Sequence, residues 1–287
     1  MKKLMLGVIL NLIVNFSVSA DTSLWKVQLN TSVTYLGGTC HVLREADYPL
    51  PEEFEKAYED SDIIVFETEI GELNSIGTQE MIVRKGIYND GLSLDKVLSH
   101  KTYDILRRYC ESLGIPVSSL NKLKPSLVVL TLLGLELQKM GVDQTGVDSY
   151  FHHKATMEGK KAEGLESVKE QIEFVLSMGR DNEDDFIEHS IKDLKKTRGI
   201  INELITAWKQ GDEDKLYEVF VAQMKKDYPD LYETLLAGRN REWLPAIERY
   251  LQTPQKEFIL VGVGHLVGED GIIEHLRRRG YKINKFD

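Results

Sequence analysis

The sequence predicts an α/β fold in which two similar halves share one mixed central sheet. A short apolar run ends in the pattern G-x-x-H at Gly38–His41, and a second run does so at Gly262–His265. Each pattern is followed by a loop, a stretch with helical spacing and another apolar run. Because sites in open α/β sheets form outside the carboxyl ends of the strands, the two histidines are expected to meet across one crevice.

The amino-terminal half is expected to begin with a hairpin. Leu24–Leu29 and Val33–Leu36 predict its two strands, and a polar turn lies between them. After His41, a helix is predicted over Pro51–Glu59, because proline in the first turn followed by acidic residues favours a helix start. The apolar run Asp62–Phe66 then predicts a buried strand.

The middle of the chain is predicted to be mainly helical. Leu92–Leu113 has helical periodicity and stops at a glycine. Val117–Leu120 is interpreted as a short strand. Leu127–Leu137 is apolar almost throughout and too short for a bilayer, so it is interpreted as a buried helix, with an exposed peptide-binding helix as the alternative.

The carboxyl-terminal half is expected to contain a helical insertion at about 167–253, where apolar residues recur at helical spacing among many charges. The second G-x-x-H unit follows it. A helix is predicted over Asp270–Arg279 and a last strand over Tyr281–Phe286, which completes the second strand–GxxH–helix–strand half.

The first twenty residues have the pattern of a signal peptide. Lys2 and Lys3 precede an apolar core over Leu4–Val14, and the segment ends in the small residues Ser19 and Ala20. Cleavage there would leave residues 21–287 as one exported domain, periplasmic or extracellular. A retained membrane anchor is less favoured because the apolar run is short for a bilayer span.

Charge and cysteine content restrict the partners. The formal net charge is −10, and such a surface repels phosphate backbones, so nucleic-acid binding is not expected. The two cysteines, Cys40 and Cys110, would be able to pair in an exported chain, with two unpaired thiols as the alternative. The oligomeric state stays open.

The two histidines and one carboxylate suggest a metal site. With seven histidines in 287 residues a single G-x-x-H is expected by chance, but two in the same context favour a shared site. Glu67 directly follows a buried strand and is the carboxylate expected beside them. Imidazole and carboxylate are the usual ligands of Zn²⁺, Mn²⁺ and Co²⁺, so His41, Glu67 and His265 are predicted to bind such an ion.

Four further residues are candidates for the chemistry around such an ion. Glu69 or Glu166 would act as general base, and Arg239 with Asn240 would polarise the substrate. The pattern H-E-x-x-H and the nucleophile elbow G-x-S-x-G are both absent. Acid–base hydrolysis by the same histidines without a metal remains an alternative.

In this setting the chain resembles the TraB/GumN proteins along nearly its whole length. The matching stretches are Leu24–Val27, Tyr35–Leu43, Asp47–Pro51, Val65–Glu67, Gly146–Asp148 with Tyr150–Phe151, Gly164–Glu166 with Gln171, Arg239–Asn240, Val261–Leu266 with Gly268, and Gly280–Tyr281. Cys40 departs from the family pattern, which more often has a small or β-branched residue there. A thiol at that position would either add a soft ligand or have no role.

The resemblance implies a fold and an activity. The family is similar to the Tiki metalloproteases and to the erythromycin esterase and ChaN-like proteins, which implies a metal-dependent peptidase acting on short peptides. It places His41, Glu67 and His265 at the metal, and Glu166, Arg239 and Asn240 at further motif positions. A non-catalytic protein that binds or sequesters peptides and a metal-free esterase of small molecules are the alternatives.

Overall fold

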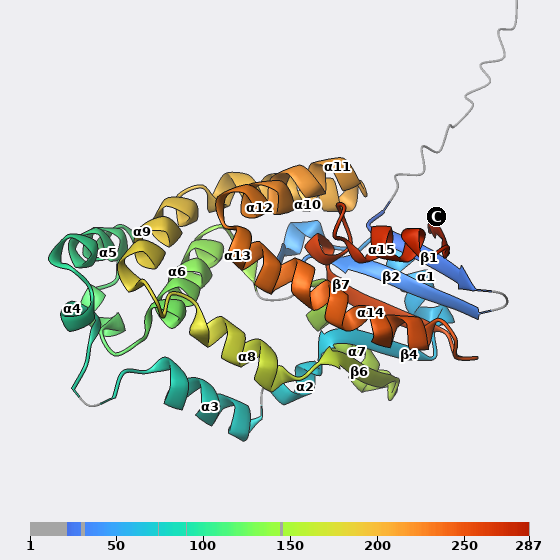
Figure 1. Ribbon diagram of the computed structural model, residues 1–287, viewed down its shortest axis with the longest axis horizontal. Coiled ribbons are helices and arrows are strands. Elements are labelled where there is room, and N and C mark those ends of the chain that lie inside the picture. The colour runs from blue at the N-terminus through green and yellow to red at the C-terminus, as the bar shows by residue number, and fades with distance from the viewer. Residues whose placement is uncertain (1–21, 30–31, 74, 90, 144–145, 287) are drawn as a thin grey trace, which may run out of the picture.

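The computed structural model shows an α/β fold with a helical lobe beside a central sheet (Figure 1). The residues that it describes are 22–29, 32–73, 75–89, 91–143 and 146–286. The predicted signal peptide, residues 1–20, lies outside them. Within them, no helix is both long and apolar enough to cross a membrane.

The sheet has six strands in the order β6-β4-β7-β2-β1-β8. Their bounds are β1 Leu24–Leu29, β2 Ser32–Thr39, β4 Ile63–Thr68, β6 Lys161–Glu166, β7 Glu257–Gly262 and β8 Lys282–Lys285. The four strands from β6 to β2 are parallel, whereas β1 runs antiparallel to both β2 and β8. The predicted mixed sheet and its opening hairpin are thus confirmed.

The register of the parallel strands brings their carboxyl ends together. β7 lies between β2 and β4, with Gly262 opposite Thr39 and Leu260 opposite Phe66. All six residues of β7 are buried, as expected for a central parallel strand that is covered on both faces. The chain segments that leave these three strands therefore meet at one edge of the sheet.

Helices from both halves pack against the sheet. Their bounds are α1 Glu52–Asp60, α7 Val147–Glu158, α10 Thr197–Lys209, α14 Gly238–Tyr250 and α15 Ile272–Arg278. Phe54 of α1 and Phe151 of α7 stack on each other, and both contact the ring of Phe258 on β7. Trp208 of α10 is fully buried and its Nε1 donates to the Gly38 carbonyl oxygen at 2.6 Å. The phenylalanine rings thus support β7, and Trp208 supports β2, so both strands that lead to a G-x-x-H pattern are packed against helices.

The helical lobe is built from two separate stretches of the chain and lies to the left of the sheet in Figure 1. The first stretch lies between β4 and β6, with α2 Ile70–Leu73, α3 Ile76–Gly86, α4 Leu94–Val97, α5 His100–Leu113 and α6 Pro125–Lys139. The second contains α8 Val168–Ser177 and α9 Glu183–Leu194. Residues of α5, α6 and α9 form a hydrophobic cluster separate from the main core. The predicted insertion at about 167–253 is thus helical, but part of the lobe comes from a stretch before it.

Two interpretations of the middle segments change. Val117–Leu120 is a 3₁₀ helix that follows Pro116, not a strand. Four residues are too few for apolar alternation to distinguish the two structures. The helix α6 is buried at Val128 and Leu132, as predicted, but Leu130 is 46% exposed.

Between α10 and α14 the chain passes through short turns, including two with π-helical hydrogen bonding. These elements are α11 Glu213–Leu216, η3 Tyr217–Ala222, α12 Gln223–Asp227, α13 Pro229–Tyr232 and η4 Glu233–Ala237. Both π-helical turns contact η5 (Val263–His265), the turn that carries the second histidine. Such turns often occur at functional sites.

Glu257, at the start of β7, allows a test of how burial in the sheet affects a carboxylate. It is fully buried and accepts hydrogen bonds from the hydroxyls of Thr34 and Thr253. Burial raises the pKa of Glu257 above its usual range, although these hydrogen bonds act against the shift. Because the folded pKa is raised, the carboxylate destabilises the fold as pH rises through that range. Glu257→Gln is therefore expected to gain about 1 kcal/mol in urea unfolding at pH 8 and nothing at pH 4. An equal effect at both pH values would contradict this.

Candidate functional site

The first histidine follows β2 and is held from the side by α7. Asp148, in the first turn of α7, accepts a hydrogen bond from His41 Nδ1 at 2.7 Å. A carboxylate can only accept, so Nδ1 carries the proton and Nε2 points elsewhere. The charge of Asp148 raises the pKa of His41 to about 9. The His41 side chain is 59% exposed, so Nε2 is open to a ligand.

The start of α7 packs directly on the backbone of His41. Val147 N donates to the Cys40 carbonyl oxygen at 3.1 Å. A Cβ atom on Gly146 would lie 2.2 Å from both the carbonyl carbon and the oxygen of His41, so only glycine fits here. Close to this contact, β3 (Leu43–Arg44) pairs with β5 (Val142–Asp143). The first turn of α7 and the β3–β5 pair thus fix the backbone around His41.

Glu67 lies at the carboxyl end of β4 and is buried. Its Oε1 accepts from the Gly262 N–H at 2.8 Å, and its Oε2 accepts from Arg239 Nη2 at 2.7 Å. Gln171 Nε2 adds a longer bond to Oε2 at 3.3 Å. Burial alone would raise the pKa of Glu67, but the neighbouring histidines, Arg239 and the Gly262 N–H lower it to about 2. The carboxylate is therefore ionised at neutral pH.

The second histidine, His265, is held in one tautomer. Asn240 donates its Nδ2 to the Asp270 carbonyl oxygen at 2.8 Å, which leaves Asn240 Oδ1 as an acceptor. That oxygen lies 2.7 Å from His265 Nδ1, so Nδ1 carries the proton and Nε2 keeps a lone pair. Burial lowers the pKa of His265 to about 3, and the ring is neutral at pH 7. Trp243 packs against it with ring centroids 4.5 Å apart.

Both imidazoles turn Nε2 towards the same carboxylate oxygen. Glu67 Oε1 is 3.9 Å from His41 Nε2 and 3.7 Å from His265 Nε2. A Cβ atom on Gly262 would point between them, 3.0 Å from His41 Nε2 and 3.2 Å from Glu67 Oε1. A cavity of about 180 Å³, lined by His41, Glu67 and Asp148 among others, opens beside this point. The predicted trio is brought together as the two G-x-x-H patterns implied.

Arg239 crosses the site from the start of α14. Its Nη2 bonds Glu67 and also Glu166 at 2.6 Å, and its Nε bonds Glu166 at 3.0 Å. Its Nη1 lies 3.1 Å from the Leu235 carbonyl oxygen in η4 and 3.3 Å from His265 Nε2. The guanidinium also lies over the Trp243 ring. This side chain therefore joins the two carboxylates to the second histidine.

The donor atoms of His41, Glu67 and His265 are of the kinds that divalent ions bind, but the structure does not bring them to the spacing of an assembled site. Zn²⁺ and similar ions bind nitrogen and oxygen at about 2.0–2.2 Å, so two donors in tetrahedral coordination lie about 3.3–3.5 Å apart. The separations of 3.7 and 3.9 Å are a few tenths of an ångström longer, so the side chains would have to close on an ion. Each Nδ1–H is held by an oxygen acceptor, as in known histidine metal sites. Binding would displace the contact between Arg239 Nη1 and His265 Nε2. In the described ranges, no group of three or more His, Cys, Asp or Glu side chains has the spacing of an assembled metal site.

The other predicted residues take different places. Glu166 accepts from Arg239 and from Trp243 Nε1 at 3.0 Å, so its oxygens are occupied. Asn240 uses both polar atoms to hold His265 rather than facing the crevice. Glu69 follows the end of β4, is exposed and does not line the 180 Å³ cavity. The geometry thus gives Glu166 and Asn240 positioning contacts and leaves Glu69 outside.

Two residues in the site were not assigned a role from the sequence. Asp148 follows Gly146, the N-cap of α7, by two positions and bonds His41 across 107 positions. Gln171 belongs to a family motif without a predicted role. The motif match at Gly146–Asp148 was the available signal, and no periodicity in the sequence connects it to His41.

Cys40 does not contribute a ligand. Its thiol is buried and donates to the Val42 carbonyl oxygen at 3.2 Å. Burial raises the pKa of Cys40 to about 11, so the thiol stays protonated. Cys110 is free as well and belongs to the helical lobe's hydrophobic cluster, whereas Cys40 belongs to the main core. The two cysteines are unpaired.

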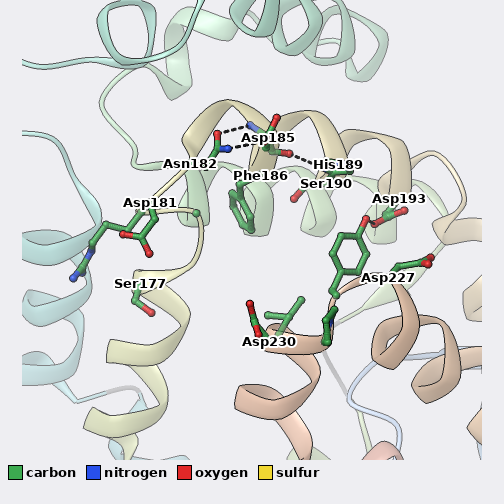
Figure 2. Close-up of a pocket in the computed structure, with 15 residues that line it drawn as sticks. Ser177, Asp181, Asn182, Asp185, Phe186, His189, Ser190, Asp193, Asp227 and Asp230 are labelled. Carbon is green, nitrogen blue, oxygen red and sulfur yellow. Dashed lines mark hydrogen bonds between the residues drawn. The ribbon is translucent and has the colours of Figure 1, made fainter.

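Figure 2 shows a larger cavity, of about 550 Å³, that shares no lining residue with this site. It lies between α9 and the turn of α12 and α13. Acidic side chains gather on it. Asn182 Nδ2 donates to the Asp185 carboxylate, and Tyr228 donates to Asp193 at 3.1 Å. No pair of histidines converges there, so size alone does not make it the better candidate.

Replacing Gly262 tests directly whether His41 and Glu67 converge on one ion. Its backbone φ of −49° suits alanine, so Gly262→Ala is expected to fold. The added methyl would occupy the space between His41 Nε2 and Glu67 Oε1. We expect divalent-ion affinity in isothermal titration calorimetry to fall by about 10–100-fold, the range seen when a metal site's supporting groups are disturbed. Unchanged affinity, with a melting temperature near that of the unmodified chain, would place any ion elsewhere.

Comparison with known proteins agrees with the resemblance. The model of the TraB/PrgY/gumN family matches residues 23–285, nearly the whole chain. No curated protein and no solved structure matches.

Proposed function

This chain belongs to the TraB/PrgY/gumN family, and on that premise we propose that it is an exported, metal-dependent hydrolase of short peptides. One observation carries the proposal. The imidazoles of His41 and His265, from opposite ends of the chain, turn Nε2 towards one ionised carboxylate oxygen, at 3.9 and 3.7 Å. His41, Glu67 and His265 would hold Mn²⁺, Co²⁺ or Zn²⁺. Such an ion supplies Lewis acidity and activates water near neutral pH.

The remaining residues prepare this donor set. Asp148 and Asn240 each hold an Nδ1 proton, so Nε2 is the nitrogen of each ring that faces the ion. Because the charge of Asp148 raises the pKa of His41 to about 9, an ion that binds at neutral pH displaces the Nε2 proton of His41. Arg239 and the Gly262 N–H keep Glu67 ionised. Because Glu166 neutralises the other face of Arg239, the guanidinium stays in place without an excess positive charge beside the ion.

Metal content tests the proposal. Residues 21–287 would be incubated with Mn²⁺, Co²⁺ and Zn²⁺, desalted and measured by plasma mass spectrometry, alongside His265→Ala. We expect close to one ion per chain in the unmodified protein and about a tenth of that or less in the variant. His153→Ala is the control, because His153 is an exposed histidine outside the site. Absence of any bound ion in the unmodified protein would overturn the proposal.

Peptide cleavage then separates hydrolysis from simple ion binding. A mixture of short peptides is expected to yield products that disappear with a chelator and return when the ion is restored. Cleavage that survives thorough chelation would contradict metal dependence.

A second candidate is metal-free hydrolysis, which one contact favours. Arg239 Nη1 lies 3.3 Å from His265 Nε2 and uses the lone pair that an ion would need. His41, which Asp148 keeps protonated at neutral pH, would then serve as general acid. Ester hydrolysis that is insensitive to chelators and lost in His41→Ala would support this alternative.

A further inference from the structure

Two cavities meet at the ion pair between Glu67 and Arg239. The first, of about 180 Å³, is lined by His41 and Glu67. The second, of about 350 Å³, is lined by Glu166 and Arg239. Glu67 Oε2 and Arg239 Nη2 are only 2.7 Å apart, so the two cavities adjoin at one hydrogen bond.

Gln171 of α8 is the residue that lines both cavities. Its Nε2 donates to Glu67 Oε2 at 3.3 Å, near the long limit for such a bond, and the side chain is only half-buried. A bond of this kind contributes little net stability, so the side chain can swing away at small cost. Gln171 is therefore a shared wall of the two cavities that can move.

The walls of the second cavity favour a positive charge. Arg239 is its cation, but Glu67 and Glu166 already neutralise it. Glu170 and Glu242 on the rim are exposed, and Glu242 has no hydrogen-bond or ion-pair partner within the described part of the chain. Phe174 adds an aromatic wall on which a cation can lie. The first cavity has instead the apolar side chains of Ile70 and Leu73 beside Asp148 and His41.

We propose that the two cavities form one peptide-binding cleft, with a lysine or arginine side chain of the substrate in the cavity lined by Glu242 and Phe174 and the peptide crossing Gln171 towards His41. This rests on the proposed function and names the substrate class of that same site: short basic peptides. Charge complementarity selects the occupant, and the shared wall at Gln171 sets where the peptide crosses.

The test measures binding without turnover. Two fluorescein-labelled alanine hexapeptides, one with a central lysine and its twin with glutamate, would be titrated with chelator-treated protein in fluorescence anisotropy, and mass spectrometry would confirm that they stay intact. We expect the lysine peptide to bind about tenfold more tightly than its twin. Glu170→Gln with Glu242→Gln should reduce that preference to about twofold, and Gln171→Trp should weaken both peptides by obstructing the crossing.

The control is Asp230→Asn, which removes one negative charge from the larger cavity of Figure 2 and should leave the preference unchanged. The proposal is overturned if neither peptide binds, if the two bind equally, or if Asp230→Asn abolishes the preference while the double variant does not. Lysine-selective binding without any hydrolysis would support the cleft and count against the proposed function. Hydrolysis of both peptides without charge preference would support the proposed function and count against the cleft.

Discussion

Replacing Arg239 by leucine is expected to lower the free energy of unfolding by about 3–5 kcal/mol, which is the cost of removing one partner of a buried ion pair. The side chains of Arg239, Glu67 and Glu166 are only 14%, 10% and 12% exposed. Without the guanidinium, both carboxylates would remain in a poorly solvated place. Glu67 would keep the Gly262 N–H and Gln171, but Glu166 would keep only Trp243. Urea unfolding at pH 7 measures the loss.

Arg241→Leu is the matched control. Arg241 lies two positions further along the same helix and pairs with Glu233, but its side chain is 51% exposed. Exposed pairs contribute about 0–1 kcal/mol, so this variant should unfold almost like the original. If both variants lost the same stability, the buried ion pair would not be the cause. The Arg239→Leu loss should also shrink as the pH falls towards 2, because protonated Glu67 no longer needs the cation.

The edge of the sheet where the site forms could be predicted from the sequence. The strands before His41, Glu67 and His265 are short apolar runs, and parallel strands place their carboxyl ends together. A local pattern of this kind needs no knowledge of distant contacts. The convergence of the two histidines on Glu67 follows from it.

The supporting residues could not be predicted in the same way. Arg239 and Glu67 are 172 positions apart, and Asp148 and His41 are 107 apart. Asp148 has the sequence pattern of a helix cap, and its actual partner depends on where α7 lies on the sheet. Asn240 was expected to act on substrate, whereas it positions His265 through Asp270. Hydrogen bonds between distant side chains are set by packing, which local patterns do not report.

The helical lobe shows the same limit on a larger scale. Periodicity predicts one helix over Leu92–Leu113, where the structure has α4 and α5, and a helix over Leu127–Leu137, which lies within α6. The packing of α5 and α6 with α9 in one hydrophobic cluster could not be predicted, because β5 and β6 lie between α6 and α9 in the chain. Amphipathic helices show which face is apolar but not which partner covers it.

Gly146→Ala is expected to have the second large effect, and it acts on the site through the backbone. The added Cβ would lie 2.2 Å from the His41 carbonyl carbon and oxygen and 2.6 Å from the Cys40 oxygen. Backbone atoms cannot rotate away as a flexible side chain does, so the start of α7 must move. That shift would break the bond from Val147 N to Cys40 and the bond between Asp148 and His41. We expect a loss of about 2–4 kcal/mol in urea unfolding, and a fall in metal affinity of about tenfold or more.

Gly134→Ala separates this effect from the general consequence of replacing glycine. Gly134 lies inside α6, and a Cβ there would meet nothing within 4 Å. Alanine in a helix interior is favoured over glycine by about 1 kcal/mol, so Gly134→Ala should be slightly more stable than the original. At Gly146 the backbone φ of −83° also suits alanine, so strain in φ cannot account for a loss. If Gly146→Ala kept both its stability and its metal affinity, close packing of α7 on His41 would not be what orients that histidine.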